Sequence, residues 1–134
     1  DAHDGRPVEG PTRAGLHALD PATGTLLWST LADDRCGDRK FCDAGISAAI
    51  TAIPGVVFAG HMDGRFRAYD SATGKVLFEF DADRDFDTLS GAHAHGGSFG
   101  GGGPAVRDGY VVVNSGYGLY FHMPGNVLLA FSAR

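Results

Sequence analysis

The residues best suited to chemistry lie in one glycine-rich segment, GAHAHGGSFGGGGP, at positions 91–104. His93, His95 and Ser98 could supply imidazole nitrogens and a hydroxyl, and glycines would let backbone approach a bound molecule closely. The alternative is a flexible surface loop with solvated imidazoles. Residues 96–100 match the G-x-S-x-G pattern, but a nucleophilic serine needs a following helix, and here more glycine, a proline and a strand follow. The segment also lacks the Lys-Ser/Thr pair of a phosphate-binding loop.

Two other segments carry groups that could bind a ligand. Four aspartates alternate in DADRDFD, residues 81–87, and carboxylates are ligands that Ca²⁺ prefers. This segment lacks the glycine and the final glutamate of an EF-hand, so we favour a solvated acidic loop and assign no metal ligands. Tyr117, Tyr120 and His122 lie in the aromatic segment SGYGLYFHMPG, which could line a substrate mouth or simply cover one end of the domain.

Composition limits the classes of protein that are possible. The chain has 134 residues, enough for one domain, with 43% hydrophobic and 20% charged residues, a balance typical of globular proteins. The net charge is -5 and lysine and arginine do not cluster, so no nucleic-acid partner is expected. No run of 18 apolar residues occurs, so we expect no membrane span. The 21 glycines argue against a helical bundle.

An internal repeat predicts the architecture that positions these residues. The segment LHALDPATGTLLW, residues 16–28, aligns without gaps to FRAYDSATGKVLF, residues 66–78, and NVLLAFSAR, residues 126–134, is a weaker third copy. Each of the first two copies holds an Asp…Thr-Gly turn between two apolar runs. A repeat of about 50 residues with short strands is typical of the blades of a β-propeller.

We therefore expect an all-β chain, a partial β-propeller of about two four-stranded antiparallel blades. Apolar, β-branched runs between Gly, Pro and Asp predict one complete blade over residues 46–80, with strands 46–53, 56–60, 65–69 and 76–80. Residues 1–14 form a loop, residues 15–30 half a blade, and residues 104–134 a final blade without its last strand. Because a propeller needs about four to eight blades to close, we expect the C-terminal part of a longer chain.

Loop lengths indicate which end of the blades carries the site. The turns within strand pairs are short at one end, whereas the links 31–45, 81–103 and 116–125 are long and open at the other end. Long loops on a rigid scaffold are where function concentrates. The link 81–103 leads into an innermost strand, so we expect its last residues, with the aromatic segment, to converge near the propeller axis.

The first copy of the repeat resembles the tryptophan-docking motif of quinoprotein propellers, whose cofactor is pyrroloquinoline quinone (PQQ). The matching residues are Ala18, Asp20, Thr23, Gly24 and Trp28. The second copy departs from the motif because a phenylalanine, Phe78, replaces the tryptophan. The stretches AAITAIPGVVFAGHMDGRFRAYD, AHGGSFGGGGP and VVVNSGYGLYFHMPGNVLLAF are similar to the polyvinyl-alcohol dehydrogenase-like branch of this superfamily.

The resemblance implies a segment of a PQQ-dependent alcohol dehydrogenase, with a ring of eight blades expected. That family oxidises small or polymeric alcohols with PQQ and usually Ca²⁺, passes electrons to a cytochrome c-type acceptor, and is periplasmic or secreted. The resemblance favours cofactor contacts from His95, Gly96, Gly97 and Ser98. With such a cofactor, Tyr117, Tyr120 and His122 are the candidate residues of a substrate mouth. The catalytic base and the Ca²⁺ ligands are expected in the remaining blades of the chain, so the 134 residues alone are expected to be inactive.

The same resemblance bears on Cys36 and Cys42, which lie six positions apart in DDRCGDRKFCDAG. Two cysteines are too few for a structural zinc site, and the spacing is not that of a C-x-x-C redox motif. In a periplasmic or secreted protein, a local disulfide is expected.

A second function remains open on the sequence alone. Because non-catalytic propellers also carry the docking motif, the chain could belong to a periplasmic scaffold that binds other proteins. The long loops at one end and the histidine–glycine segment favour the enzyme.

Overall fold

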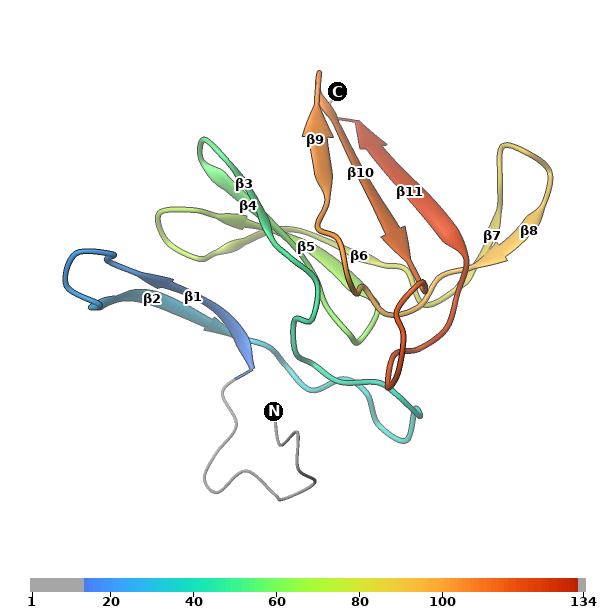
Figure 1. Cartoon of the computed structure of the whole chain (residues 1–134), viewed down its shortest axis with the longest axis horizontal. Coiled ribbons are helices and arrows are strands. Elements are labelled where there is room, and N and C mark those ends of the chain that lie inside the picture. The colour runs from blue at the N-terminus through green and yellow to red at the C-terminus, as the bar shows by residue number, and fades with distance from the viewer. Residues whose placement is uncertain (1–13, 133–134) are drawn as a thin grey trace.

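The computed structural model describes residues 14–132, all of which lie in strands, turns or irregular segments (Figure 1). The strands are β1 (Gly15–Leu19), β2 (Leu26–Leu31), β3 (Thr51–Ile53), β4 (Val56–Gly60), β5 (Arg65–Asp70), β6 (Val76–Asp81), β7 (Asp85–Asp87), β8 (His93–His95), β9 (Ala105–Arg107), β10 (Tyr110–Ser115) and β11 (Val127–Ser132). The all-β prediction is confirmed over this part of the chain. The predicted loop 1–14, apart from its last residue, and the last two residues of the final blade lie outside the described residues.

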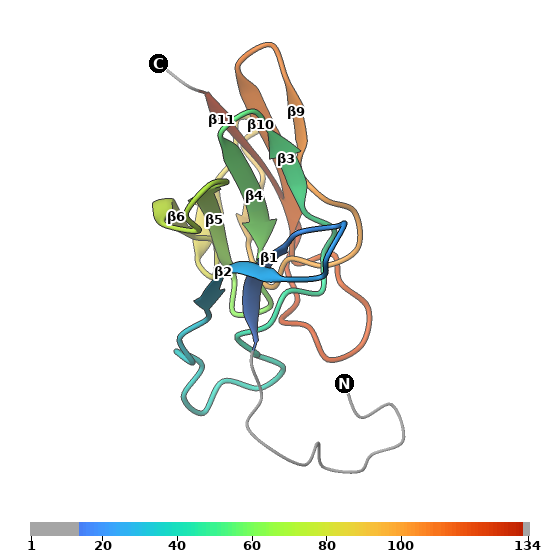
Figure 2. The ribbon, with the colours of Figure 1, turned by 90° about the vertical axis from the view of Figure 1, so that its left-hand side faces the viewer.

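Three antiparallel sheets are stacked in chain order, as the blades of a propeller are. The middle sheet has the order β3-β4-β5-β6, and it lies between the β1–β2 hairpin and the sheet β11-β10-β9 (Figures 1 and 2). The described residues therefore form a partial β-propeller. Within them, no helix has the length and hydropathy needed to cross a membrane.

The repeated turns fold alike in the two copies. Asp20 Oδ1 accepts hydrogen bonds from the amides of the two residues before Gly24, and Asp70 does the same before Gly74. Gly24 and Gly74 have φ values of 70° and 72°, which other residues rarely adopt. Both strand pairs also shift register at the matching position, after Ala18 and after Ala68. The sequence repeat is thus a repeat of turn geometry.

Trp28 joins the first two sheets. Its indole Nε1 donates a hydrogen bond of 3.0 Å to the carbonyl of Ser71, in the β5–β6 turn. The ring lies against Gly74, where a Cβ would come within 2.4 Å of it. The Thr30 hydroxyl donates to the carbonyl of that same glycine at 2.6 Å. Trp28 therefore packs between two neighbouring blades.

An aromatic cluster joins the second and third sheets. Phe131 of β11 packs against Phe66 at 5.3 Å, Phe80 at 5.1 Å and Phe78 at 5.6 Å between ring centroids. Phe78, the counterpart of Trp28, also lines an apolar cleft of about 620 Å³ between these sheets. The second interface therefore relies on ring packing where the first has an indole hydrogen bond.

Two predicted boundaries differ from the structure. The first strand of the full blade starts at Thr51 and not at residue 46, because residues 45–49 bond to other loops: the Gly45 carbonyl accepts from Met62, and the Ala49 amide donates to Gly101. The link 81–103 was predicted as a loop, but it contains the hairpin β7–β8, which pairs Asp85 with His95 and Asp87 with His93. This hairpin extends away from the stacked sheets (Figure 1).

Candidate functional site at the long-loop end

The glycine-rich segment and the aromatic segment lie against each other at the long-loop end. The Ser98 amide donates to the Met123 carbonyl at 3.0 Å, and the Asn126 amide donates to the His95 carbonyl at 2.7 Å. The Asn126 side-chain oxygen accepts from the His95 amide at 2.9 Å, which closes a two-way pair. The structure thus brings together two segments that the loop lengths predicted to meet.

The Ser98 side chain connects these two segments through hydrogen bonds. Its hydroxyl donates to the Met62 carbonyl and accepts from the Met123 amide, and the residue is fully buried. The Ser115 side chain makes a similar contact with Gly97, the residue before Ser98. The Ser115 hydroxyl donates to the Gly97 carbonyl at 2.7 Å. A hydroxyl committed to two backbone groups fixes the path of the chain; it does not face solvent.

Gly96 and Gly97 are required for the close approach of backbone segments. A Cβ on Gly96 would lie 1.9 Å from the carbonyl oxygen of Ala82, and one on Gly97 would lie 2.4 Å from that of Met123. Both glycines are buried. We expected these glycines to leave room for a flat cofactor, but here the protein's own backbone fills that space. Gly102, in contrast, has nothing within 4 Å of its Cβ position.

His95 is the exposed member of the predicted cofactor segment, with 47% of its side chain accessible. Its Nδ1 lies 2.9 Å from Asp85 Oδ1, and its Nε2 lies 3.4 Å from Asp83 Oδ1. The hydrogen bond with Asp85 raises the pKa of His95, and the nearby Asp83 carboxylate acts in the same direction. The bond with His95 lowers the pKa of Asp85. His95 is therefore protonated over a wider pH range than a solvated histidine.

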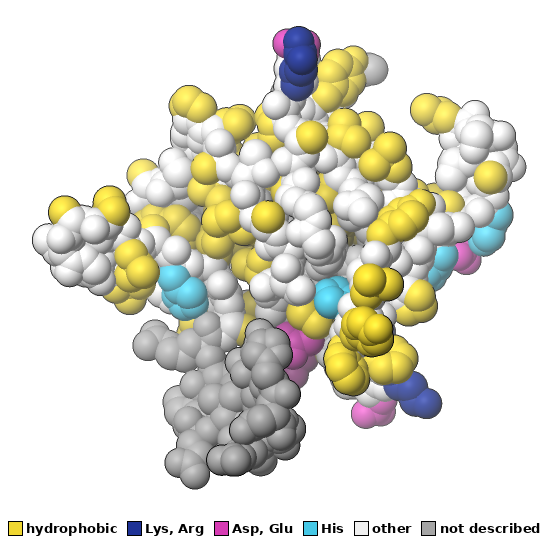
Figure 3. Space-filling model, viewed as in Figure 1, with side chains coloured by type: hydrophobic (Ala, Val, Ile, Leu, Met, Phe, Trp, Pro, Cys, Tyr) yellow, Lys and Arg dark blue, Asp and Glu magenta, His cyan; other side chains and the backbone are white. Residues whose placement is uncertain are grey.

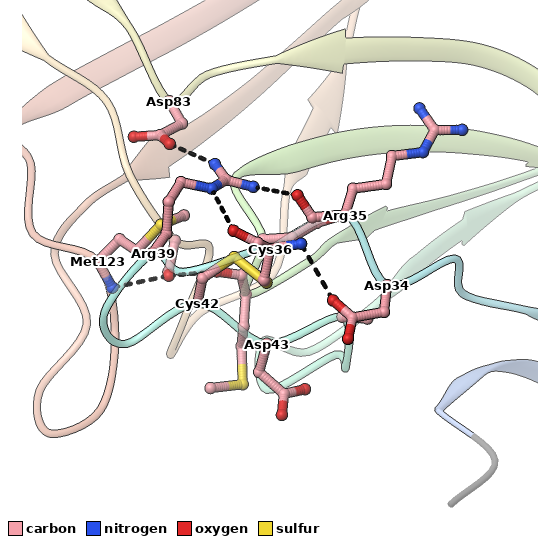
Figure 4. The surroundings of a disulfide bond; sticks show 12 residues. Asp34, Arg35, Cys36, Arg39, Cys42, Asp43, Asp83 and Met123 are labelled. Atoms are coloured by element: carbon pink, nitrogen blue, oxygen red, sulfur yellow. Dashed lines mark hydrogen bonds and ion pairs between the residues drawn. A yellow bond between two sulfur atoms is a disulfide. The ribbon is translucent and has the colours of Figure 1, made fainter.

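The acidic segment is solvated as we favour, with three of its four aspartates exposed, but part of it is strand β7 and its carboxylates form ion pairs. Asp83 forms an ion pair with Arg39 through its second oxygen, and Asp85 lies within 3.4 Å of the second hairpin histidine, His93. Arg39 lies in the loop closed by the disulfide between Cys36 and Cys42, whose predicted pairing is confirmed (Figure 4). Sequence reasoning missed these ion pairs. The available signal was the alternation of Asp-Phe-Asp and His-Ala-His on either side of a Ser-Gly turn, which is a hairpin pattern.

The aromatic segment has an exposed tip and a packed base. Tyr117 and Tyr120 are 56% and 86% exposed. Hydrophobic side chains gather at the lower right of Figure 3, where the loop after β10 and the loop before β3 both lie in Figure 1. His122 turns inward: its Nδ1 donates to the Tyr120 carbonyl at 2.6 Å, and its ring fills the space beside Gly100 and Gly118. The two tyrosines are thus accessible, while His122 supports the loop from below.

Several buried polar side chains lie at this end of the middle sheet. Nδ1 of the fully buried His61 lies 3.1 Å from the Ala44 carbonyl. Because a carbonyl only accepts, that nitrogen carries the proton, and Nε2 accepts from the Tyr69 hydroxyl at 2.8 Å. Burial lowers the pKa of His61, which keeps the ring neutral. Arg67 and Asp63 lie in the same layer, both buried. These groups support the loops and do not reach solvent.

Among residues 14–132, no group of three or more His, Cys, Asp or Glu side chains is arranged to hold a metal ion. The exposed functional groups of these residues are an imidazole with a raised pKa between two carboxylates and, on the separate aromatic segment, two accessible phenols.

Comparison with known proteins assigns the chain to a family. The profile of one family, PQQ_2, described as "Outer membrane protein assembly factor BamB", matches residues 12–134. The chain belongs to this family. It is also 41% identical over 133 residues to a polyvinylalcohol dehydrogenase from Sphingopyxis, an alignment that covers 90% of this chain and 20% of that protein.

More distant relatives of this PQQ_2 chain include a 1-butanol dehydrogenase (cytochrome c) from Thauera butanivorans, 32% identical over 75% of this chain and 14% of that protein. Among solved structures, the quinohemoprotein alcohol dehydrogenase from Comamonas testosteroni gives a TM-score of 0.49, with 30% identity over 72% of this chain and 13% of that one. The chain spans about a fifth of the length of the polyvinylalcohol dehydrogenase that it matches.

Proposed function

We propose that the chain is a segment of a PQQ-dependent alcohol dehydrogenase that passes electrons to a cytochrome c-type acceptor. The observation that carries this proposal is the 41% identity to a polyvinylalcohol dehydrogenase over 90% of the chain. The name of the related 1-butanol dehydrogenase (cytochrome c) supports the proposed acceptor. Small or polymeric alcohols are the proposed substrates, and a periplasmic or secreted location, which the disulfide supports, is proposed with them.

The proposed cofactor contact is the segment His95–Ser98. PQQ is a flat, anionic quinone, and His95 is an accessible imidazole with a raised pKa. Because both of its ring nitrogens face carboxylates, in this proposal the ligand takes the place of Asp85, whose side chain is 69% exposed, at Nδ1. Gly96, Gly97 and Ser98 are buried, so in this proposal they act by fixing where His95 lies. When bound, PQQ would supply the quinone that accepts a hydride from the alcohol carbon. Ca²⁺ is proposed from the resemblance alone, with ligands from outside residues 14–132.

Tyr117 and Tyr120 are the proposed substrate mouth, supported by His122. Their rings are accessible at the same end as His95, and phenols can both stack on carbon chains and bond to hydroxyls. Further blades of a longer chain are proposed partners of the free edges of β1 and β11, since the sheets that hold them have two and three strands where the middle sheet has four. The segment alone is accordingly proposed to be inactive.

The test is reconstitution of the full-length protein that contains this segment. The purified protein is incubated with PQQ, with and without Ca²⁺, and alcohol-dependent reduction of an artificial dye is followed for ethanol, 1-butanol and polyvinyl alcohol. We expect reduction that requires PQQ and an alcohol. Absence of PQQ-dependent reduction with all three alcohols would contradict the proposal.

A non-catalytic scaffold is the second candidate, favoured by the description of the PQQ_2 family as an outer membrane protein assembly factor. In that case the full-length protein would bind no PQQ, and the exposed tyrosines would contact a protein partner. Equilibrium binding of PQQ, measured by quenching of tryptophan fluorescence, separates the two candidates before any activity assay.

A further inference from the structure

We propose that Arg39 is a positioning residue: the disulfide-closed loop 36–42 holds its guanidinium so that it fixes the Asp83 carboxylate, and Asp83 in turn fixes the His95 imidazole. The link to cofactor binding rests on the proposed function, because only that function gives His95 a ligand. The contacts themselves connect parts of the chain that are 44 residues apart.

Two backbone carbonyls of the loop and its flank hold the Arg39 guanidinium. Nε donates to the Cys36 carbonyl at 3.2 Å, and Nη2 donates to the Arg35 carbonyl at 3.0 Å. The Arg39 amide also donates to the Cys36 carbonyl at 3.2 Å, so backbone and side chain bond to the same oxygen. The bond from Cys36 to Cys42 closes the loop around these groups. A planar guanidinium held at two of its nitrogens has its third nitrogen aimed by the loop.

That third nitrogen, Nη1, pairs with Asp83 Oδ2 (Figure 4). The other oxygen of the same carboxylate, Oδ1, lies 3.4 Å from His95 Nε2. Asp83 is only 20% exposed, and its amide is bonded to Asp81 Oδ1 at 3.1 Å. One carboxylate thus bridges the arginine of one loop and the histidine of another, and its plane is set by the arginine.

The remaining groups that face His95 do not replace this contact. Asp85 Oδ1, on the paired strand β7, lies 2.9 Å from Nδ1, but its side chain is 69% exposed and is shared with His93. Asn126 binds the His95 amide and not its ring. Since Asp85 holds one ring nitrogen only, the tilt of the imidazole depends on Asp83, and through it on Arg39.

The test compares the His95 titration in the full-length protein, labelled with ¹³Cε1-histidine and assigned by a His95→Gln variant. Asp83→Asn removes one carboxylate beside His95, so we expect a lower midpoint of the His95 titration than in the wild type. This variant is the reference for the others. If Arg39 positions Asp83, Arg39→Ala releases the carboxylate and also lowers the midpoint, by about 0.5 pH unit at this partly exposed site. If Arg39 acted only as a nearby positive charge, its removal would raise the midpoint instead. A raised or unchanged midpoint overturns the proposal.

Arg39→Lys is the matched variant, because it keeps the charge while a single ammonium cannot serve all three acceptors in this geometry. We expect its midpoint to fall as in Arg39→Ala; a wild-type midpoint would show that charge alone matters. The paired variant Cys36→Ser/Cys42→Ser, which opens the loop, is expected to lower the midpoint as well. Arg107→Ala, an arginine on the last sheet beside Asp108, should leave it unchanged.

PQQ affinity gives the functional readout. With the full-length protein and PQQ alone, we expect Arg39→Lys to raise the dissociation constant about tenfold, within the range of such coupling effects, with a melting temperature close to that of the wild type. Unchanged affinity would overturn the link to cofactor binding. If the wild type binds no PQQ, the proposed function fails, while the His95 titration still decides whether Arg39 positions Asp83.

Discussion

The indole nitrogen of Trp28 donates a 3.0 Å hydrogen bond to the carbonyl of Ser71, which lies 43 residues later in the turn of the next sheet. Trp28 is the last residue of the first copy of the repeat, and it docks onto the turn of the second copy. A residue of the repeat itself therefore fixes how the first sheet docks onto the second.

Replacing Trp28 by Ala should destabilise the stack by about 3 kcal/mol, since a large, mostly buried ring is lost from the first interface. Trp28→Phe keeps most of the packing and loses the hydrogen bond, so about 1 kcal/mol is expected. Chemical denaturation of the full-length protein measures both values. Leu89→Ala, at the exposed hairpin tip, is the control, and equal stability of Trp28→Ala and this control would show that the docking contact is unimportant.

The ion pair between His95 and Asp85 should make the β7–β8 hairpin sensitive to pH. The folded pKa of His95 is raised, so its contribution is complete below about pH 6.5 and is lost as the pH rises through the raised value. The folded pKa of Asp85 is lowered, so its contribution is complete above about pH 4 and is lost only in stronger acid.

Hydrogen exchange measures this dependence. Protection factors of amides in residues 84–96, corrected for intrinsic exchange, should fall between pH 6 and pH 8.5, while those of β4 and β5 stay level. In His95→Gln the dependence should disappear. Constant protection of the wild-type hairpin across this range would be evidence that the pair contributes nothing to hairpin stability.

The sequence was informative where structure is local and uninformative where it depends on loops that meet. The Asp…Thr-Gly turns have their own side-chain acceptors and a left-handed glycine, so Asp20 and Asp70 marked two hairpins correctly. The β7–β8 hairpin was missed because each of its strands has three residues, two of them polar. The Arg39–Asp83 contact lies between two loops, and no periodicity encodes it.

We expect the positive charge of Arg67 to be needed for the stability of the fold. It is buried, its Nε bonds to Glu79 at 2.7 Å, and its Nη2 lies 3.7 Å from the fully buried Asp63. Arg67→Met keeps much of the volume but leaves Asp63 with less compensation, so we expect a loss of about 3 kcal/mol.

A double variant shows whether charge is the cause. Without Arg67, the Asp63 carboxylate keeps only Arg65 as a cationic neighbour, with Nε at 3.7 Å. Asp63→Asn added to Arg67→Met removes this carboxylate charge and should restore part of the lost stability, which a double-mutant cycle in denaturant measures. Arg107→Ala serves as the exposed control, since that side chain is 90% accessible. If Arg67→Met were as stable as this control, the buried pair would be dispensable.

Gly96 and Gly102, two glycines of one segment, should respond differently to substitution by alanine. Gly96→Ala places a Cβ 1.9 Å from the Ala82 carbonyl, a backbone atom that cannot rotate away, so we expect a loss of about 1–3 kcal/mol. Gly102→Ala meets nothing within 4 Å, and its φ lies outside the left-handed region, so stability should be unchanged or slightly higher. Thermal unfolding of the two full-length variants provides the comparison. If both were equally tolerated, the glycines at 96 and 97 would not be there for close backbone packing, and room for a flat ligand would again be the better explanation.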